Sequence, residues 1–539
     1  MAASDARAAK AVCVENATIA ELRQALAAGD TTAAGLVQAY LARIAAYDQT
    51  GPRLNAVREV NPDAAAIAAQ SDAREPAQRR PLEGIPILIK DNVATADTQH
   101  TTAGSLALEG ARAKDDATVV KLLRQAGAVI IGKANLTEFA NILAIDMPAG
   151  YSSLGGQVKN PYALELDDKN VPVVLPGGSS SGSAVAIAAG LAAAAIGTET
   201  SGSLLSPASQ NGVVTVKPTV GLISRAGIVP IAHSQDTAGP LTRTVTEAAM
   251  LLNVLAAADP LDAATAELRR PADYTSFLDR DGLKGARIGV PSDPSDPAND
   301  FYYGPLPQGA AAVMREAIAV LEREGATVVR ANIPTEGWIG GPGTEMAILN
   351  RNPESATKNQ PARRPIVFVY ELKHDLNLYL RDWAAATGIG SLAEIVAFNN
   401  GHADRALRFG QDIFLAAEAT RGDLSEIEYI SARQMDLRAS RTLGLDAYLD
   451  AHRLDAVLFP AATGAAISAR AGYPSIHVPA GFVSGMRDKE TPDYPYGAAF
   501  TGRAWSEPVL LRIAYAFEQA TEACRPPPGL PTLDLACAR

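Results

Sequence analysis

Two clusters of serine and glycine carry the residue types best suited to covalent chemistry in this chain. The first, GGSSSGS, covers residues 177–183, and the second, TSGS, covers residues 200–203. A serine hydroxyl becomes a nucleophile only when a nearby base takes its proton. Backbone N–H groups in a glycine turn or at a helix N-terminus can hold a negatively charged oxygen. The clusters could therefore supply a nucleophile and an oxyanion site.

Three interpretations of these clusters compete. Serines that cap helices and glycines that form turns are the most common use of any single cluster of this kind. A nucleophile elbow is the second, because GSSSG at 178–182 matches G-x-S-x-G with Ser180 at its centre. That motif needs a partner histidine, and no later histidine stands in a recognisable triad context. The third is a serine hydrolase whose base is a lysine with a lowered pKa.

The flanking sequence predicts strands that alternate with helices, which is typical of an α/β fold around a central sheet. A Gly-Asp-Thr-Thr break separates two amphipathic helices within residues 18–48. The alanine-rich run at 183–195 predicts a helix between the two clusters. Further helices are predicted at 117–126 and early in 309–333, and strands at 85–90, 128–132, 288–292, 455–461, 474–482 and late in 309–333.

The composition excludes several classes of protein. The 539 residues are 47% hydrophobic and 20% charged, as in a globular protein. A net charge of −11 disfavours nucleic acid as a partner, because phosphate binding needs a basic face. No apolar run is long enough to span a bilayer, so we expect no membrane insertion. The first residues lack the apolar core of a signal peptide. An exported protein whose signal peptide has been removed would look the same, so the sequence does not decide whether this soluble protein is cytoplasmic or exported.

The three cysteines give no metal motif. There is no CxxC pair and no Cys/His spacing of a zinc site, so we expect neither a metal nor another cofactor. Cys524 and Cys537 flank the turn-rich RPPPGLPTLDLA. A disulfide between them and a pair of free thiols near a frayed end are equally compatible with this spacing.

A combination of segments closely resembles the amidase signature family. These segments are GIPILIKDN, PGGSSSGSAVAIAAG, AIGTETSGSLLSPA, NGVVTVKPTVGLISRAGIVPI, SQDTAGP, AGYPSIHVPAGF and PVLLRIAYAFEQAT. The resemblance runs from about residue 18 to residue 520, and GTETSGSLLSPA looks most like peptide amidases of bacteria and plants. It implies one α/β domain at 18–520 with a large mixed sheet sandwiched between helices. Residues 1–17 and 521–539 are then tails, and 335–430, more helical and more charged, is a candidate helical insertion.

The resemblance also implies a Ser–cis-Ser–Lys triad. Ser203 matches the nucleophile, Ser179 matches the bridging serine that follows a cis peptide bond, and Lys90 matches the base. A lysine has an ordinary pKa near 10.4, and a lysine that ends a strand is usually exposed. Burial behind the apolar strand would lower its pKa. Neutral Lys90 could then take a proton from Ser203 through Ser179 and return it to the leaving amine.

The residues around the triad receive supporting roles. Ser180 is expected to hydrogen-bond its loop, Asp91 to orient the turn after Lys90, and Asp236 in SQDTAGP to stabilise a turn. Leu205 stands where many members carry arginine, so we expect an apolar substrate pocket there. The oxyanion is expected to bind the backbone N–H groups of Thr200, Ser201, Gly202 and Ser203.

The predicted function is that of a serine amidohydrolase that cleaves carboxamide C–N bonds through an acyl-enzyme. The favoured substrates are C-terminal amides of peptides or similar apolar amides. Aryl-acylamide or carbamate hydrolysis is the alternative within this class, since the same triad would serve. Membership of a transamidation complex, as one of its subunits, is the alternative outside it. A small-molecule or peptide amide is the expected partner, and a monomer is the simplest expectation for an oligomeric state that stays open.

Overall fold

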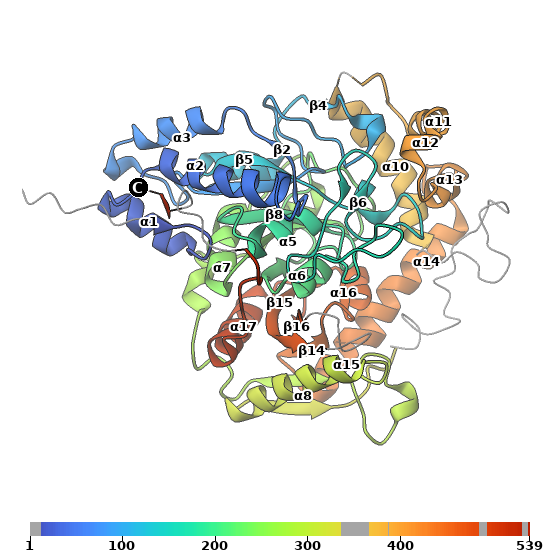
Figure 1. Cartoon of the computed structure of the whole chain (residues 1–539). Coiled ribbons are helices and arrows are strands. Elements are labelled where there is room, and N and C mark those ends of the chain that lie inside the picture. The colour runs from blue at the N-terminus through green and yellow to red at the C-terminus, as the bar shows by residue number, and fades with distance from the viewer. Residues whose placement is uncertain (1–11, 336–365, 386, 485–492, 531–536, 539) are drawn as a thin grey trace, which may run out of the picture.

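The centre of the molecule is a mixed β-sheet. The computed structural model describes residues 12–335, 366–385, 387–484, 493–530 and 537–538. Within these residues, one sheet has 11 strands in the order β12-β11-β14-β16-β15-β9-β10-β8-β3-β5-β2 (Figure 1). Its strands are β2 (Val57–Val60), β3 (Pro86–Lys90), β5 (Val129–Ala134), β8 (Ala194–Glu199), β9 (Val214–Lys217), β10 (Thr237–Thr242), β11 (Arg287–Val290), β12 (Thr327–Arg330), β14 (Ala456–Pro460), β15 (Ser475–Val483) and β16 (Tyr494–Thr501).

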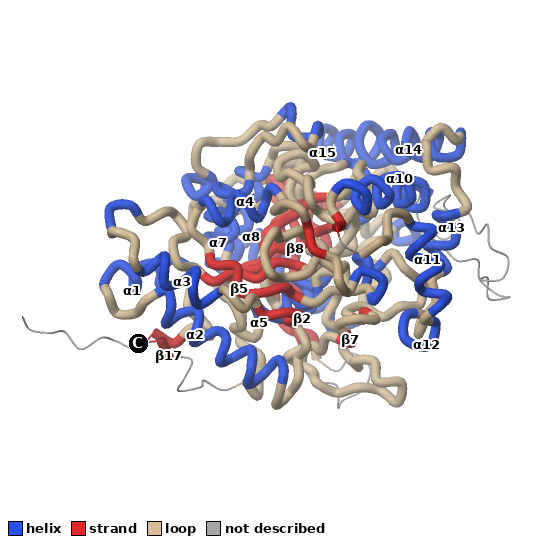
Figure 2. Tube along the Cα trace, turned by 90° about the horizontal axis from the view of Figure 1, so that it is seen from above, coloured by secondary structure: helices blue, strands red, loops and turns tan. Residues whose placement is uncertain are grey.

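Helices lie outside this sheet, as Figure 2 shows. They are α1 (Ile19–Ala28), α2 (Ala33–Arg43), α3 (Ala64–Asp72), α4 (Thr118–Gln125), α5 (Ser181–Ala188), α6 (Leu205–Asn211), α7 (Val245–Leu255), α8 (Gln308–Arg323), α10 (Ile366–Asp382), α11 (Leu392–Gly401), α12 (Ala403–Ala406), α13 (Asp412–Glu418), α14 (Ile427–Leu437), α15 (Asp446–His452), α16 (Ala465–Ala471) and α17 (Glu507–Thr521). The predicted α/β fold with a mixed sheet between helices is confirmed.

Strand β3 runs parallel to both of its neighbours, β5 and β8. Parallel neighbours need crossover connections, and α4 and α5 lie in the segments that provide them. All five residues of β3 are buried, as the continuous apolar run of its sequence predicts. Lys90 is the last of these residues, so the fold places a lysine at the carboxyl end of a buried central strand.

The predicted helix at 183–195 is wrong in its second half. Helix α5 ends at Ala188, and Gly190 adopts a left-handed conformation with φ 66° that turns the chain. Residues from Ala194 onward then form β8, a fully buried strand between β3 and β10. Alanine favours a helix by intrinsic propensity, but pairing and burial between two strands outweigh that preference here.

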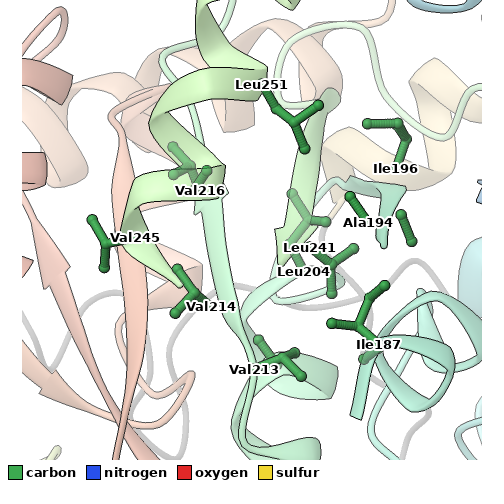
Figure 3. Packing of buried hydrophobic residues seen from close by; sticks show 14 of the residues in the cluster. Ile187, Ala194, Ile196, Leu204, Val213, Val214, Val216, Leu241, Val245 and Leu251 are labelled. Carbon is green, nitrogen blue, oxygen red and sulfur yellow. The ribbon is translucent and has the colours of Figure 1, made fainter. Parts of the chain in front are cut away.

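The helix–strand unit that joins the two serine clusters packs around Leu204. Figure 3 shows Leu204 among side chains of α5, β8, β10 and α7, which include Ile187, Ile196 and Leu241. Leu204 is fully buried. The residue that follows Ser203 therefore anchors the second cluster in the main core.

A second, smaller hydrophobic cluster lies beside the main one. Helices α10, α11 and α13 contribute half of its buried residues, and these pack against residues from 103–147 and 229–232. Figure 1 shows these helices along one side of the molecule. The described part of the predicted insertion at 335–430 is mainly helical, whereas residues 336–365 lie outside the described residues. The boundaries of the domain at 18–520 and of its tails stay predictions.

The termini decide between the two alternatives that the sequence left open for Cys524 and Cys537. Cys524 carries a free thiol, whereas Cys13 is disulfide-bonded. Strand β1 (Val12–Cys13) pairs antiparallel with β17 (Cys537–Ala538), which sets the backbone of Cys13 opposite that of Cys537. Of the two alternatives, the disulfide between Cys524 and Cys537 is therefore wrong, and Cys13 is the cysteine that lies opposite Cys537. Across the described residues, no helix combines the length and the apolar character needed to cross a bilayer.

Candidate active site

Lys90 lies at the centre of a buried cluster of hydroxyl groups. Its Nζ donates hydrogen bonds to the hydroxyl oxygens of Ser179 at 2.8 Å, Ser180 at 3.0 Å and Thr198 at 2.8 Å. Lys90 is fully buried, and this desolvation lowers its pKa from 10.5 to about 7, although the carboxylates of Glu199 and Asp236 raise it. The amine is therefore neutral in a large fraction of molecules at neutral pH and able to accept a proton.

Ser179 reaches this amine from the loop before α5. The peptide bond between Gly178 and Ser179 is cis. The carbonyl of Ser179 accepts a hydrogen bond from the N–H of Thr137 at 3.0 Å, and its side chain is fully buried. The structure thus brings two of the three predicted triad residues into direct contact.

Ser203 lies on the neighbouring turn, against the same loop. Its carbonyl accepts a hydrogen bond from the N–H of Ser180 at 3.1 Å, so the two serine clusters are joined directly. Gly202 has φ +86°, a left-handed conformation that glycine adopts without strain. Ser203 is 7% exposed, whereas Ser179 and Ser180 are fully buried. Among the predicted triad residues, Ser203 is therefore the one with access to solvent.

The turn leaves its amide groups open. Among the described residues, none accepts a hydrogen bond from the backbone N–H groups of residues 200–203. Glu199 holds the next two N–H groups, since its Oε2 accepts from Leu204 at 2.7 Å and from Leu205 at 3.0 Å. The side chain of Glu199 thus fixes the start of α6 and leaves the preceding amides free for a ligand.

Asp236 connects this turn to the loop before β10. Its Oδ1 accepts a hydrogen bond from the hydroxyl of Thr200, and its Oδ2 accepts from the N–H groups of Ile231 and Ala232, both at 2.9 Å. Burial raises the pKa of Asp236 to about 6. The expected turn-stabilising contacts are present, and the bond to Thr200 ties the turn to the predicted oxyanion site.

The two supporting residues occupy different surroundings. The hydroxyl of Ser180 donates to the carbonyl of Thr198 at 3.0 Å and accepts from its N–H at 3.2 Å, which joins the first cluster to β8. Asp91 accepts hydrogen bonds from Thr102 and forms an ion pair with Arg58 at 2.5 Å. Both residues therefore make contacts within the loops beside Lys90, and their supporting roles in the reaction stay predictions.

A cavity of about 250 Å³ opens next to the cluster. Thr198, Thr200 and Asp236 line it on the side of the serine turns, and residues 225–231 form a second wall. The third wall belongs to α10 and the residue after it, with Leu378, Tyr379 and Trp383. Leu205 is buried at the start of α6 and does not line this cavity, so its role in a substrate pocket stays a prediction.

Several residues of the site were missed from the sequence. Thr198 contacts Lys90, and its hydroxyl also accepts a hydrogen bond from Asn92 at 3.0 Å. Both lie inside quoted motifs, GTETSGS and LIKDN, so their positions beside the predicted residues could have indicated them. Tyr379 and Asp375 line the cavity from a helix that carries no recognisable motif. No local signal could have found these two residues.

Comparisons with known proteins agree with this geometry. The Amidase family profile matches residues 35–511, which is most of the chain. The chain therefore belongs to the amidase signature family, and it is an enzyme that hydrolyses amides. A serine triad and an oxyanion hole are typical of this family.

Three relatives show the range of that similarity. The crystal structure of native peptide amidase from Stenotrophomonas maltophilia has 42% identity and a TM-score of 0.81, with 95% of this chain and 98% of that chain covered. A probable amidase of Arabidopsis thaliana is 39% identical over 97% of this chain and 94% of its own length. A glutamyl-tRNA(Gln) amidotransferase subunit of Chloroflexus aurantiacus is 32% identical over 94% of this chain and 96% of its own.

Proposed function

We propose that the chain is a serine amidohydrolase that uses Ser203 as nucleophile, Ser179 as proton relay and Lys90 as base. The observation that carries this proposal is the contact of 2.8 Å between the Lys90 amine and the Ser179 hydroxyl. The amine is fully buried, and its pKa lies near 7. A lysine in this state can act as a general base, which an exposed lysine cannot do at neutral pH.

The first half of the reaction forms an acyl-enzyme. The oxygen of Ser203 bonds to the amide carbonyl carbon while its proton passes to Ser179, whose own proton passes to Lys90. The negative oxygen of the tetrahedral intermediate accepts hydrogen bonds from the open amides of residues 200–203. The C–N bond then breaks, and the proton on Lys90 returns through Ser179 to the leaving nitrogen.

The second half regenerates the enzyme. Water attacks the acyl carbon and gives one proton to the same relay, and a second tetrahedral intermediate forms. Its C–O bond to Ser203 breaks, and the serine oxygen takes the proton back. The products are a carboxylic acid and ammonia or an amine, so no cofactor enters the balance.

Peptide C-terminal amides are the substrate class that we favour. A peptide amidase is 42% identical to this chain, and a structure of a peptide amidase with the competitive inhibitor chymostatin is similar over 95% of it. Apolar side chains of α10 in the cavity wall, Leu378 and Tyr379, suit an uncharged, extended acyl chain. Aryl-acylamides and carbamates remain alternatives within the class, because each offers a carbonyl and an amine leaving group.

The test compares kcat/KM for an N-blocked leucinamide or phenylalaninamide with that for free glutamine. Each buried CH₂ contributes about 0.8 kcal/mol, so apolar acyl groups should be cleaved several-fold faster than acetamide. A free carboxylate beside the scissile amide costs several kcal/mol to desolvate without a partner, so glutamine should be a poor substrate. Equal or faster turnover of glutamine would refute the substrate class and leave the triad intact. An anilide and a carbamate in the same panel test the alternatives.

A role as the amidase component of a transamidation complex is the second candidate. Relatives named as glutamyl-tRNA(Gln) amidotransferase subunits, one of them 32% identical, favour it. Such a component would need a partner chain and would use glutamine. Ammonia release from peptide amides by the purified single chain, with no partner added, would exclude this second candidate.

A further inference from the structure

Two histidines and an aspartate from distant segments meet at the rim of the cavity. His233 follows the loop of residues 225–231, whereas His374 and Asp375 belong to α10. The Nδ1 of His233 lies 2.9 Å from Oδ2 of Asp375, and the Nδ1 of His374 lies 2.7 Å from its Oδ1. One donor atom from each of the three residues lies within 4.8 Å of the others. Imidazole nitrogens and a carboxylate oxygen thus converge on one small volume.

This donor set matches the chemistry of zinc. Zn²⁺ binds imidazole nitrogen and carboxylate oxygen at about 2.0–2.2 Å in a tetrahedral arrangement, which separates neighbouring donor atoms by about 3.3 Å. The two nitrogen–oxygen contacts, at 2.9 and 2.7 Å, are somewhat shorter than this spacing, and one donor atom from each residue lies within 4.8 Å of the others. Two imidazoles favour zinc, copper or nickel over magnesium and calcium, which prefer oxygen ligands alone.

Neighbouring groups orient the carboxylate of Asp375, whereas the imidazole rings of His233 and His374 remain accessible to solvent. The Oδ2 of Asp375 also accepts the backbone N–H of His233 at 2.8 Å, which orients the carboxylate. The carboxylate of Glu371 lies 3.6 Å from Nδ1 of His233 and adds negative charge beside the cluster. The side chains of His233 and His374 are 46% and 34% exposed, so an ion can enter from solvent.

The cluster also joins two walls of the cavity. His233 and Asp375 both line it, one from the loop wall and one from α10. We propose that His233, His374 and Asp375 bind a divalent transition-metal ion such as zinc. The bound ion connects the loop wall to α10, and it inhibits the enzyme because it restricts access to the cavity. Inhibition rests on the proposed function, because it requires the cavity to be the substrate site. Binding of the ion does not.

The binding test uses zinc and a chromophoric chelator that competes for it. Untagged wild-type protein should take up one equivalent of zinc. His374→Ala removes one imidazole without touching the cavity lining and should weaken zinc binding about tenfold or more. His233→Ala should weaken it similarly. His402→Ala is the matched control, because His402 is an exposed histidine between α11 and α12, away from the cluster. This variant should bind zinc as tightly as wild type does. Equal zinc affinity in wild type and His374→Ala, or no zinc uptake by wild type, would overturn the site.

The inhibition test measures amide hydrolysis as zinc is added. Wild type and His402→Ala should lose activity over the zinc concentrations that fill the site, and a chelator should restore it. His374→Ala should retain its zinc-free activity and need about tenfold more zinc for the same loss. If zinc fills the site completely and hydrolysis is not inhibited, the proposal that the bound ion restricts access to the cavity is refuted. A protein that binds zinc but hydrolyses no amide would refute the proposed function and leave the site standing.

Discussion

Three buried lysines show that burial alone does not make a base. Desolvation lowers the pKa of Lys90 to about 7 and the pKa values of Lys133 and Lys217 to about 8. Lys217 donates to a backbone carbonyl, and Lys133 donates to the carbonyl of Val93 and to the hydroxyl of Thr101, none of which belongs to the serine clusters. Lys90 instead contacts two hydroxyl groups of the first serine cluster and the hydroxyl of Thr198. The neighbouring groups, rather than the lowered pKa, distinguish the candidate base.

The pH dependence of the reaction should report Lys90. Its charged form is inactive in the proposed mechanism, so kcat/KM should rise with pH and level off above about pH 7. Lys90→Arg should be inactive at every pH, because a guanidinium stays charged. Glu199→Gln removes a carboxylate that raises the pKa of Lys90, so it should move the rising limb to lower pH. A shift of that limb to higher pH would contradict the assignment.

The nucleophile can be identified by removing one oxygen atom. Ser203→Ala should lower kcat by about 10⁴-fold or more and leave the melting temperature nearly unchanged, since Ser203 is at the edge of the core and its carbonyl contact is retained. A serine-reactive phosphonate should label wild type at Ser203 by peptide mass mapping. Labelling at Ser180 would instead support the nucleophile elbow, although the Ser180 hydroxyl is buried and bonded to Thr198.

Sequence reasoning reached the candidate chemistry but only part of the cavity. Lys90, Ser179 and Ser203 stand in local motifs whose resemblance to the amidase signature family implies their roles. Tyr379 and Asp375 come from a helix whose alternation of apolar and polar residues indicates only that one face is buried. The residues that contact the buried face of α10 are determined by how this helix packs against a loop that is distant in sequence. The cluster of His233 with His374 was invisible for the same reason.

At the scale of elements, the alanine run shows where local propensity fails. Alanine side chains occur both in α5 and in the central strand β8, which begins after five intervening residues. Glycine at 190 is the one local sign of the break. Strands with longer apolar side chains, such as β3, β5 and β15, were predicted to within a few residues, because β-branched residues favour strands directly.

Helix α5 begins in close contact with two other backbones. A Cβ added at Gly182 would lie 2.3 Å from the carbonyl oxygen of Ala56 and 2.5 Å from that of Asn135. Backbone atoms cannot move aside as a flexible side chain can, so Gly182→Ala should lower the free energy of unfolding by about 3 kcal/mol. Activity should fall too, since α5 follows the loop of Ser179.

Gly401→Ala is the control for this prediction. Gly401 ends α11, and a Cβ there would meet nothing within 4 Å. Its substitution should leave stability unchanged or raise it by about 0.5–1 kcal/mol. Urea unfolding curves of both variants give the comparison, and equal stability of Gly182→Ala and wild type would show that the packing at the start of α5 is looser than described.

At the scale of the whole molecule, the buried apolar residues of the described chain form three hydrophobic clusters of unequal size. The main cluster holds most of the sheet, and the second cluster holds residues of α10, α11 and α13. A region with fewer buried apolar contacts opens at a lower free energy than the core. Native-state hydrogen exchange in low urea should therefore show α10 exchanging by local opening while β3 exchanges only on global unfolding. Identical opening free energies for α10 and β3 would show one cooperative unit.

The cavity wall formed by α10 lies apart from the proposed catalytic groups, and this separation has a consequence for the evolution of the enzyme. The groups proposed to break the amide bond come from β3 and the two serine clusters, and Thr198 of β8 contacts Lys90, whereas α10 contributes a wall and none of the groups around Lys90. Mutations in α10 therefore change which molecules fit while the proton relay is inherited intact. Proteins with this fold can therefore evolve a new substrate specificity through substitutions in one helix, and every intermediate in that evolution can keep the hydrolytic activity.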